Sequence, residues 1–146
     1  IALGGWTSSN YAALACGTEF PTCQREWWPD TDFREGFVPW RGLGFNYEGG
    51  VLDGPARTAI HMSHRLGALL VFGHLLGVAV MAIRRRMVGL GLTLGSLLSL
   101  QIMLGISNVV FGLPLPIATA HNGVAALLMF TLLVALVRIR STLVSL

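Results

Sequence analysis

The chain of 146 residues contains no lysine, few charged residues and no acidic residue after position 53. All ten basic residues are arginines, and charged residues make up 12% of the chain. A soluble domain usually has about 25% charged residues, so this shortage excludes an ordinary soluble fold and indicates an integral membrane protein. The net charge of +3 comes from arginines that are dispersed or lie at helix ends, and it gives no reason to expect a nucleic-acid partner.

Long apolar runs fill most of the second part of the chain. The runs are Thr58–Ile83, Met87–Leu113 and Ile117–Val137. Each has the roughly 20 residues that cross a hydrocarbon core of about 30 Å. The runs lack the alternation of barrel strands, and only helices otherwise satisfy their backbone hydrogen bonds in lipid. We therefore expect three membrane-spanning helices in a lipid bilayer.

The start of the chain is also apolar, but residues 1–15 are too few to span a bilayer and contain no initiator methionine. We expect the end of a helix whose beginning is missing, and hence a chain that is a fragment. The predicted fold is an all-α integral membrane protein: an antiparallel four-helix transmembrane bundle with a truncated first helix. A large external loop over residues 16–57 precedes the three helices of residues 58–146.

The arginines predict which side of the membrane each segment faces. Arg84, Arg85 and Arg86 join the first and second runs, and Arg138 and Arg140 follow the third. Short basic loops mark the cytoplasmic side. The acidic 16–57 segment and the turn at 112–116 would then lie outside.

Two histidines lie just inside the outer ends of two of these runs. At 1.5 Å per residue, His64 is about 10 Å below Arg57, and His121 is about 8 Å below Pro116. Polar residues in a membrane interior are functional candidates. Two imidazoles at similar depth on parallel helices could hold one planar metal cofactor between them. Heme fits better than zinc, because zinc needs three or four ligands and the runs offer no carboxylate or thiol.

Three other charged or polar residues of the first run have two explanations each. Arg65 could pair with heme propionates or extend to the lipid headgroups. His61 could line the heme edge, although a cap at the interface is favoured. His74 could contact the missing part, although a neutral packed histidine is favoured. Hydrogen bonds between helices explain the polar groups of the second run: Gln101, Ser107 and Asn108.

The external segment holds both cysteines of the chain, Cys16 and Cys23. In an oxidising periplasm the pair predicts a disulfide, which could be structural or could pass electrons during catalysis. The segment also has many aromatic residues, which suit a cap on the membrane interface or a roof over a cofactor pocket: Trp27, Trp28, Phe33, Phe37, Trp40, Phe45 and Tyr47.

Several strings together resemble the C-terminal half of the heme A synthase family, in the family's order and over nearly the whole chain. They are LGGWTSSNYAALAC at 3–16, FPTCQ at 20–24, HR at 64–65, QIMLGISNVV at 101–110 and PLPIATAHNGVAALL at 114–128. The resemblance implies a duplicated four-helix bundle in the bacterial inner membrane, with residues 16–57 periplasmic. It implies that His64 and His121 are axial ligands of a b-type heme, heme b, and that the cysteines match external-loop cysteines of the family.

The family oxidises the C8 methyl of heme O to a formyl group by successive hydroxylation and loss of water. A glutamate four residues before a histidine is implicated, but Ile60 and Ile117 occupy those places here. The resemblance therefore implies no catalytic residue in this chain and a substrate pocket mostly in the missing N-terminal half-bundle. The implied partners are heme O as substrate, that half-bundle, heme O synthase and an electron acceptor.

Two other functions also use a pair of ligating histidines. One is a b-type electron-transfer membrane cytochrome, and the other is a non-catalytic heme-binding assembly subunit. Spacing does not separate them from the enzyme, whereas the family strings favour heme A synthase.

Overall fold

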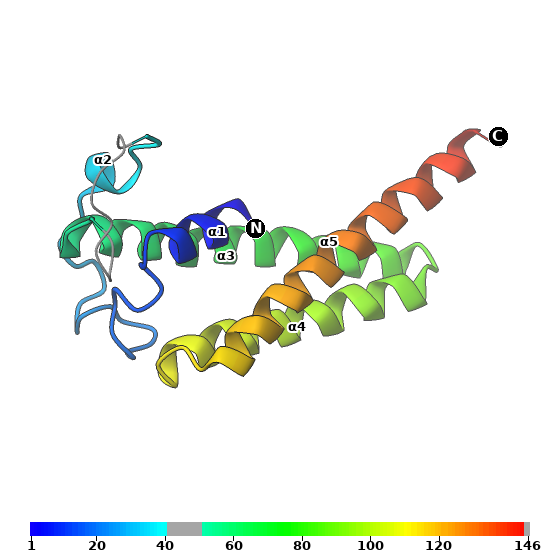
Figure 1. Cartoon of the computed structure of the whole chain (residues 1–146). Coiled ribbons are helices and arrows are strands. Elements are labelled where there is room, and N and C mark those ends of the chain that lie inside the picture. The colour runs from blue at the N-terminus through cyan, green and yellow to red at the C-terminus, as the bar shows by residue number, and fades with distance from the viewer. Residues whose placement is uncertain (41–50, 145–146) are drawn as a thin grey trace. The chain divides into compact units, whose positions relative to one another are not determined.

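The computed structural model describes residues 1–40 and 51–144, with side chains to residue 137 in the last helix. Every regular element in these ranges is a helix: α1 (Ala2–Ser9), α2 (Phe33–Gly36), α3 (Gly54–Arg84), α4 (Val88–Val110) and α5 (Leu115–Val144) (Figure 1). The prediction of an all-helical protein is confirmed for the described ranges.

The helices form two compact units, and each is described by itself. The first unit comprises residues 1–69 and 106–114, and the second comprises residues 70–105 and the chain from Leu115 onward. α3 and α4 contribute residues to both units.

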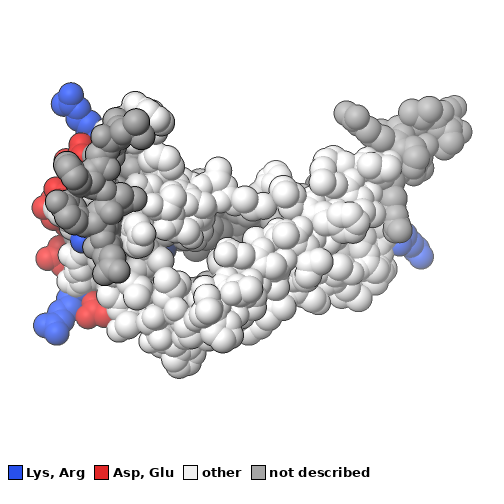
Figure 2. All heavy atoms as spheres, in the orientation of Figure 1, with Lys and Arg blue, Asp and Glu red and all other residues white. Residues whose placement is uncertain are grey.

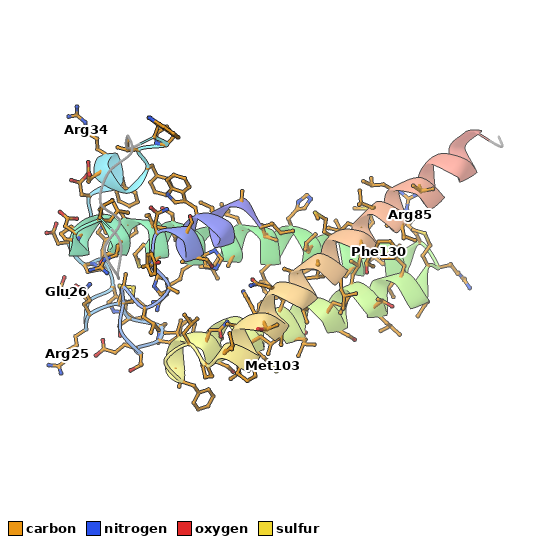
Figure 3. All side chains as sticks on the ribbon, in the orientation of Figure 1. Arg25, Glu26, Arg34, Arg85, Met103 and Phe130 are labelled. Carbon is orange, nitrogen blue, oxygen red and sulfur yellow. A yellow bond between two sulfur atoms is a disulfide. The ribbon has the colours of Figure 1, made fainter. Side chains whose placement is uncertain are left out.

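The three long helices are each long and apolar enough to cross a membrane, α5 over Leu115–Val137. Only 17% of the residues in the most apolar stretch of each helix are buried, and many of their large apolar side chains are exposed. Met103 and Phe130, for example, are 58% and 65% exposed and project from α4 and α5 in Figure 3. Exposed apolar surface of this extent suits lipid rather than water. The chain is an integral membrane protein, and the three predicted helices are confirmed.

α3 begins one turn before its apolar run, at Gly54 rather than Thr58. Asp53 caps this end, because its Oδ1 accepts a hydrogen bond of 2.9 Å from the backbone N–H of Ala56. Pro55 is tolerated there because the first helical turn has no internal partner for its nitrogen. The first turn of α3 therefore takes in residues 54–57, including Arg57.

The chain turns back in the same way after α1, α3 and α4. In each case the second residue after the helix has backbone angles in the left-handed region. These residues are Tyr11 (φ 52°), Arg86 (φ 65°) and Gly112 (φ 68°). After each, backbone N–H groups donate back into the last helical turn, which satisfies carbonyls that the helix leaves unpaired. Because the chain turns back at Tyr11, α1 ends at Ser9, although the apolar stretch at the start of the chain continues to Ala15.

In the first unit, α1 and α2 pack on the first turns of α3. The indole Nε1 of Trp6 donates to the carbonyl of Gly36 at 2.9 Å. A Cβ added at Gly36 would lie 2.8 Å from the carbonyl oxygen of Ala56, so the absence of a side chain allows the backbone of α2 to approach α3. Trp6 packs against the buried core of this unit: Ala12, Leu52, Ala56 and Ile60.

Charged side chains of the first unit gather over the segment that precedes α3 (Figure 2). Arg25, Glu26 and Arg34 project from this segment in Figure 3. The second unit has a purely apolar core from α3, α4 and α5: Leu75, Ala79, Leu94, Leu98 and Leu128.

Candidate functional site

His64 lies on α3 in the first unit and is half-buried. Its ring faces α1, because a Cβ added at Gly4 would lie 3.5 Å from the His64 Cε1 atom. One turn further along α3, a Cβ at Gly67 would lie 2.7 Å from a methyl carbon of Leu3. Gly67 therefore serves close packing of α1 on α3, which is one of the two roles that small residues have in membranes.

Arg65, the next residue, is bound to the external segment. Its Nη1 donates to the carbonyls of Pro21 and Thr22 at 3.2 and 3.0 Å. Its Nη2 donates to the carbonyl of Glu19 at 3.0 Å, and its Nε donates to His61 Nε2 at 3.2 Å. A guanidinium can make such bonds in several directions at once because its donors form a rigid planar fork. Arg65 therefore holds the segment around Pro21 against α3.

His61 is 3% exposed and lies one turn before Arg65 on α3. Because Arg65 Nε donates to it, its Nε2 is the acceptor and carries no proton. Through this bond the ring supports the side chain of Arg65, which in turn binds the external segment.

Cys16 and Cys23 form a disulfide, with their Cα atoms 4.5 Å apart. Both cysteines are 1% exposed and pack against Met62 of α3. Thiol–disulfide exchange needs access for an attacking thiolate. The burial of both sulfur atoms favours the structural role over the redox role.

A tight turn at residues 23–26 follows the disulfide and also joins the external segment to α3. Cys23 and Glu26 exchange two backbone hydrogen bonds of 2.9 and 3.0 Å, and the two residues between them both have positive φ angles. The side chain of Gln24 reaches α3, where its Nε2 donates to Thr58 Oγ1 at 3.0 Å.

Replacing Cys16 and Cys23 together by serine is expected to lower the free energy of unfolding by about 2–3 kcal/mol, because the cross-link restricts the unfolded chain. Thermal unfolding of the purified protein in detergent, with and without a reductant, measures this effect. A double variant that unfolds at the temperature of the oxidised protein would contradict the structural role.

His121 lies on α5 in the second unit and is also half-buried. Its Nε2 lies 3.2 Å from Nε2 of Gln101 on α4, within hydrogen-bond distance. A Cβ added at Gly105 would lie 3.1 Å from His121 Cε1, so the ring occupies the space that a side chain at position 105 would fill. Gln101 Oε1 and His121 Nδ1 are both buried and have no hydrogen-bond partner among the described residues.

The described residues contain no group of three or more histidine, cysteine, aspartate or glutamate side chains able to hold a metal ion. A zinc site with three or four protein ligands is therefore not formed by this part of the chain. A heme iron needs only two axial ligands, and the imidazoles of His64 and His121 are chemically suited to that role.

The sequence matches the model of the COX15-CtaA family, described as cytochrome oxidase assembly protein, over residues 1–133. The chain belongs to this family. A heme A synthase from Shewanella oneidensis is 50% identical over 133 residues, which are 90% of this chain and 40% of that protein. The chain thus spans about two fifths of the length of this curated relative. No solved structure matches the chain.

The part matched to the COX15-CtaA family includes the two cysteines, Arg65 and both proposed ligands. Three of these groups, His64, Arg65 and the disulfide, lie in the first unit, whereas His121 lies in the second.

The prediction that His74 is packed is wrong for the described structure, where its side chain is exposed on α3. The neighbouring Leu70 and Met81, which are also exposed, show that much of this helix lacks a protein neighbour in the described structure. The predicted hydrogen bond between helices is confirmed for Gln101, which contacts His121 across α4 and α5. The identity of its partner was not predicted from the sequence.

Proposed function

We propose that the chain forms the heme-binding C-terminal half of a heme A synthase, which oxidises the C8 methyl of heme O to the formyl of heme A. The observation that carries this proposal is the 50% identity to a heme A synthase over 133 residues. The matched region is 40% of that relative, and we place the substrate pocket in the part outside it.

His64 and His121 are the proposed axial ligands of a b-type heme. In the sequence they lie seven residues after Arg57 and five after Pro116, about 10 and 8 Å beyond these two residues at the helical rise. The ring of His121 lies beside Gly105, where a Cβ would crowd it at 3.1 Å from Cε1, whereas a Cβ at Gly4 would make only ordinary contact with His64. A bound heme would supply a one-electron redox centre. The role of the chain is to bind and orient this centre and to keep it in an apolar surrounding.

Arg65 has one further donor for a heme propionate. Its four hydrogen bonds use Nε, both protons of Nη1 and one of Nη2. A guanidinium has five N–H groups, so one remains on Nη2. Arg65 can therefore make a single bond to a propionate while it holds the external segment, but a bidentate pair would require it to release a carbonyl.

The apolar helices carry no acidic residue, because all seven acids precede position 54. The glutamate that the family resemblance implicates in the oxidation has no counterpart here, because Ile60 and Ile117 occupy the positions four residues before His64 and His121. We therefore assign no catalytic residue to this chain, and we place the acid–base chemistry with the substrate pocket.

In the proposed topology, the bundle lies in the bacterial inner membrane with residues 16–57 in the periplasm, and α1 is the end of a fourth membrane helix. The arginines at 84–86 face the cytoplasm. Arg138 and Arg140 are assigned to the same side, although their side chains lie outside the described residues. Phe45 and Tyr47 also lie outside them, whereas the other five aromatic residues considered for the membrane interface are exposed: Trp27, Trp28, Phe33, Phe37 and Trp40.

Co-expression of the intact protein with a source of heme O tests the proposal. We expect heme A among the porphyrins extracted from the membranes, identified by chromatography and mass. The matched control is the same host with an empty vector. A folded, heme-loaded protein that leaves heme O unconverted would instead fit a b-type electron-transfer cytochrome or a heme-binding assembly subunit.

A further inference from the structure

α1 covers one side of α3 in the first unit, and the two helices run antiparallel there. Ala12, just after α1, shares a buried cluster with Ala56 and Ile60 of α3. Leu3, near the start of α1, lies instead beside Gly67, where an added Cβ would be 2.7 Å from a methyl carbon of Leu3. Going back along α1 therefore means going forward along α3.

The same side of α3 can be followed beyond Gly67, because α3 is one continuous helix. Residues three and four apart lie on one face of a helix, and this spacing leads from Gly67 to Val71, His74, Val78 and Met81. Val71 and Met81 are 55% and 60% exposed, and His74 is exposed as well. Beyond Gly67, most of this side is therefore uncovered in the described structure.

His74 makes lipid an unsuitable cover for this side. It lies about 15 Å before Arg84 at the helical rise, too far for its ring to reach the headgroups at that end. Ionisable residues inside membrane helices almost always face protein or a water-filled cavity, because hydrocarbon offers them no hydrogen bond. The core of the second unit does not provide this cover, since the buried residues that α3 contributes to it are Leu75 and Ala79.

α1 points to the occupant of this side. With 8 residues, α1 is about 12 Å long, whereas a membrane helix needs about 20 residues. The heme A synthase of Shewanella oneidensis is longer than this chain, since the 133 matched residues are 40% of it. Because α1 already covers the first part of this side, a helix that continues α1 backwards meets the rest of it without a change of direction.

We propose that, in the full-length protein, the chain preceding Ile1 extends α1 along α3 and covers Val71, His74 and Met81. This inference rests on the proposed topology, in which α1 is the end of a fourth membrane helix. It adds the side of α3 on which that helix lies, the register of the contact and a protein environment for His74.

The register follows from the antiparallel contact of Leu3 with Gly67. For each residue that the chain is followed back from Leu3, the contact moves one residue forward on α3, since both helices rise by about 1.5 Å per residue. Val71 then meets a position about 3 residues before Ile1, and Met81 meets a position about 13 residues before Ile1.

Pairs of cysteines in the full-length protein test this register in membranes. Met81→Cys is combined with a cysteine at each of four consecutive positions, one turn of helix, centred about 13 residues before Ile1. Oxidation with copper phenanthroline links cysteines that meet, and mass spectrometry of the peptides identifies the linked pair. We expect a link within one chain from at least one of the four positions. Cys16 and Cys23 do not compete, because they are already joined.

Val80→Cys is the matched control for Met81→Cys. Val80 is also exposed and lies at nearly the same depth, but it lies about 140° around α3 from Gly67 at about 100° per residue. No link to the same four positions is expected. If Val80→Cys forms links and Met81→Cys does not, the assigned side of α3 is wrong.

A second pair keeps the test decisive if a variant at Met81 does not fold. Val71→Cys is combined with cysteines in the turn centred about 3 residues before Ile1, and a link within one chain is again expected. Leu69→Cys is its control, because Leu69 is 66% exposed but lies about 160° around α3 from Gly67. Absence of a link from Val71→Cys, in protein that is inserted in the membrane and folded, would overturn the proposal.

Links between two chains, seen at the mass of a dimer, would also overturn it, because a second copy would then cover this side. Formation of heme A by the same protein tests the proposed function separately. Links within the chain without heme A would leave the packing in place and count against the enzyme. Heme A without such links would support the enzyme and refute the packing.

Discussion

Replacement of His64 or His121 by alanine is expected to abolish the bis-imidazole heme spectrum of the purified protein. Low-spin heme needs both axial positions occupied, and alanine offers no donor atom. Each single variant should therefore either lose the heme or retain it in a high-spin form with one ligand. Absorption spectra of the oxidised and reduced protein, together with electron paramagnetic resonance, measure the change.

His74→Ala is the matched control for these two variants. His74 also lies on an apolar helix, but its side chain is exposed and no role in the proposed site is assigned to it. Its heme spectrum is expected to equal that of the wild type. If His64→Ala and His121→Ala both keep an unchanged spectrum, the two histidines are not the ligands. Recovery of the low-spin spectrum on adding free imidazole would show that the variants still fold.

The second large effect is expected for Arg65→Ala, which should release the external segment from α3. The side chain donates to three backbone carbonyls between Glu19 and Thr22. A hydrogen bond to a charged group contributes about 1.5–3 kcal/mol, and the bonds of one side chain are not additive. We expect the free energy of unfolding to fall by about 3 kcal/mol. Lysine should restore only part of it, because its single ammonium nitrogen cannot occupy the separate positions of Nε, Nη1 and Nη2 from which Arg65 donates.

Trypsin reports the release of this segment. The side chain of Arg25 is 91% exposed, and cleavage after it requires the tight turn between Cys23 and Glu26 to open. We expect faster cleavage there in Arg65→Ala and wild-type cleavage in Arg34→Ala, since Arg34 is exposed on α2. An unchanged rate in Arg65→Ala would refute the role in holding the segment. Loss of heme with an unchanged rate would instead favour the propionate role.

The features that depend on local pattern were predictable from the sequence. Three apolar runs long enough to cross a bilayer became three helices, because lipid leaves the backbone few alternatives. The disulfide was predictable because the two cysteines are close in the chain. Asp53 before Gly54 and Pro55 is a recognisable start of a helix, and it could have placed the beginning of α3 one turn earlier.

Features that depend on residues distant in the chain were not predictable. The partners of Arg65 are backbone carbonyls more than 40 positions earlier, and a backbone carbonyl has no signature in the sequence. The end of α1 depends on Tyr11 adopting a left-handed conformation, which is uncommon for residues other than glycine. The contact between Gln101 and His121 depends on which faces of α4 and α5 meet, and a helix that is apolar all round does not reveal this.

The attachment of the external segment has a consequence for the order of assembly during synthesis. In the proposed topology, Cys16 and Cys23, which are seven positions apart, can be oxidised as soon as both have reached the periplasm. The guanidinium that binds the carbonyls of Glu19, Pro21 and Thr22 is translated later, about three turns into α3. The cross-linked ring can therefore form before the side chain that fixes it to α3 has been made.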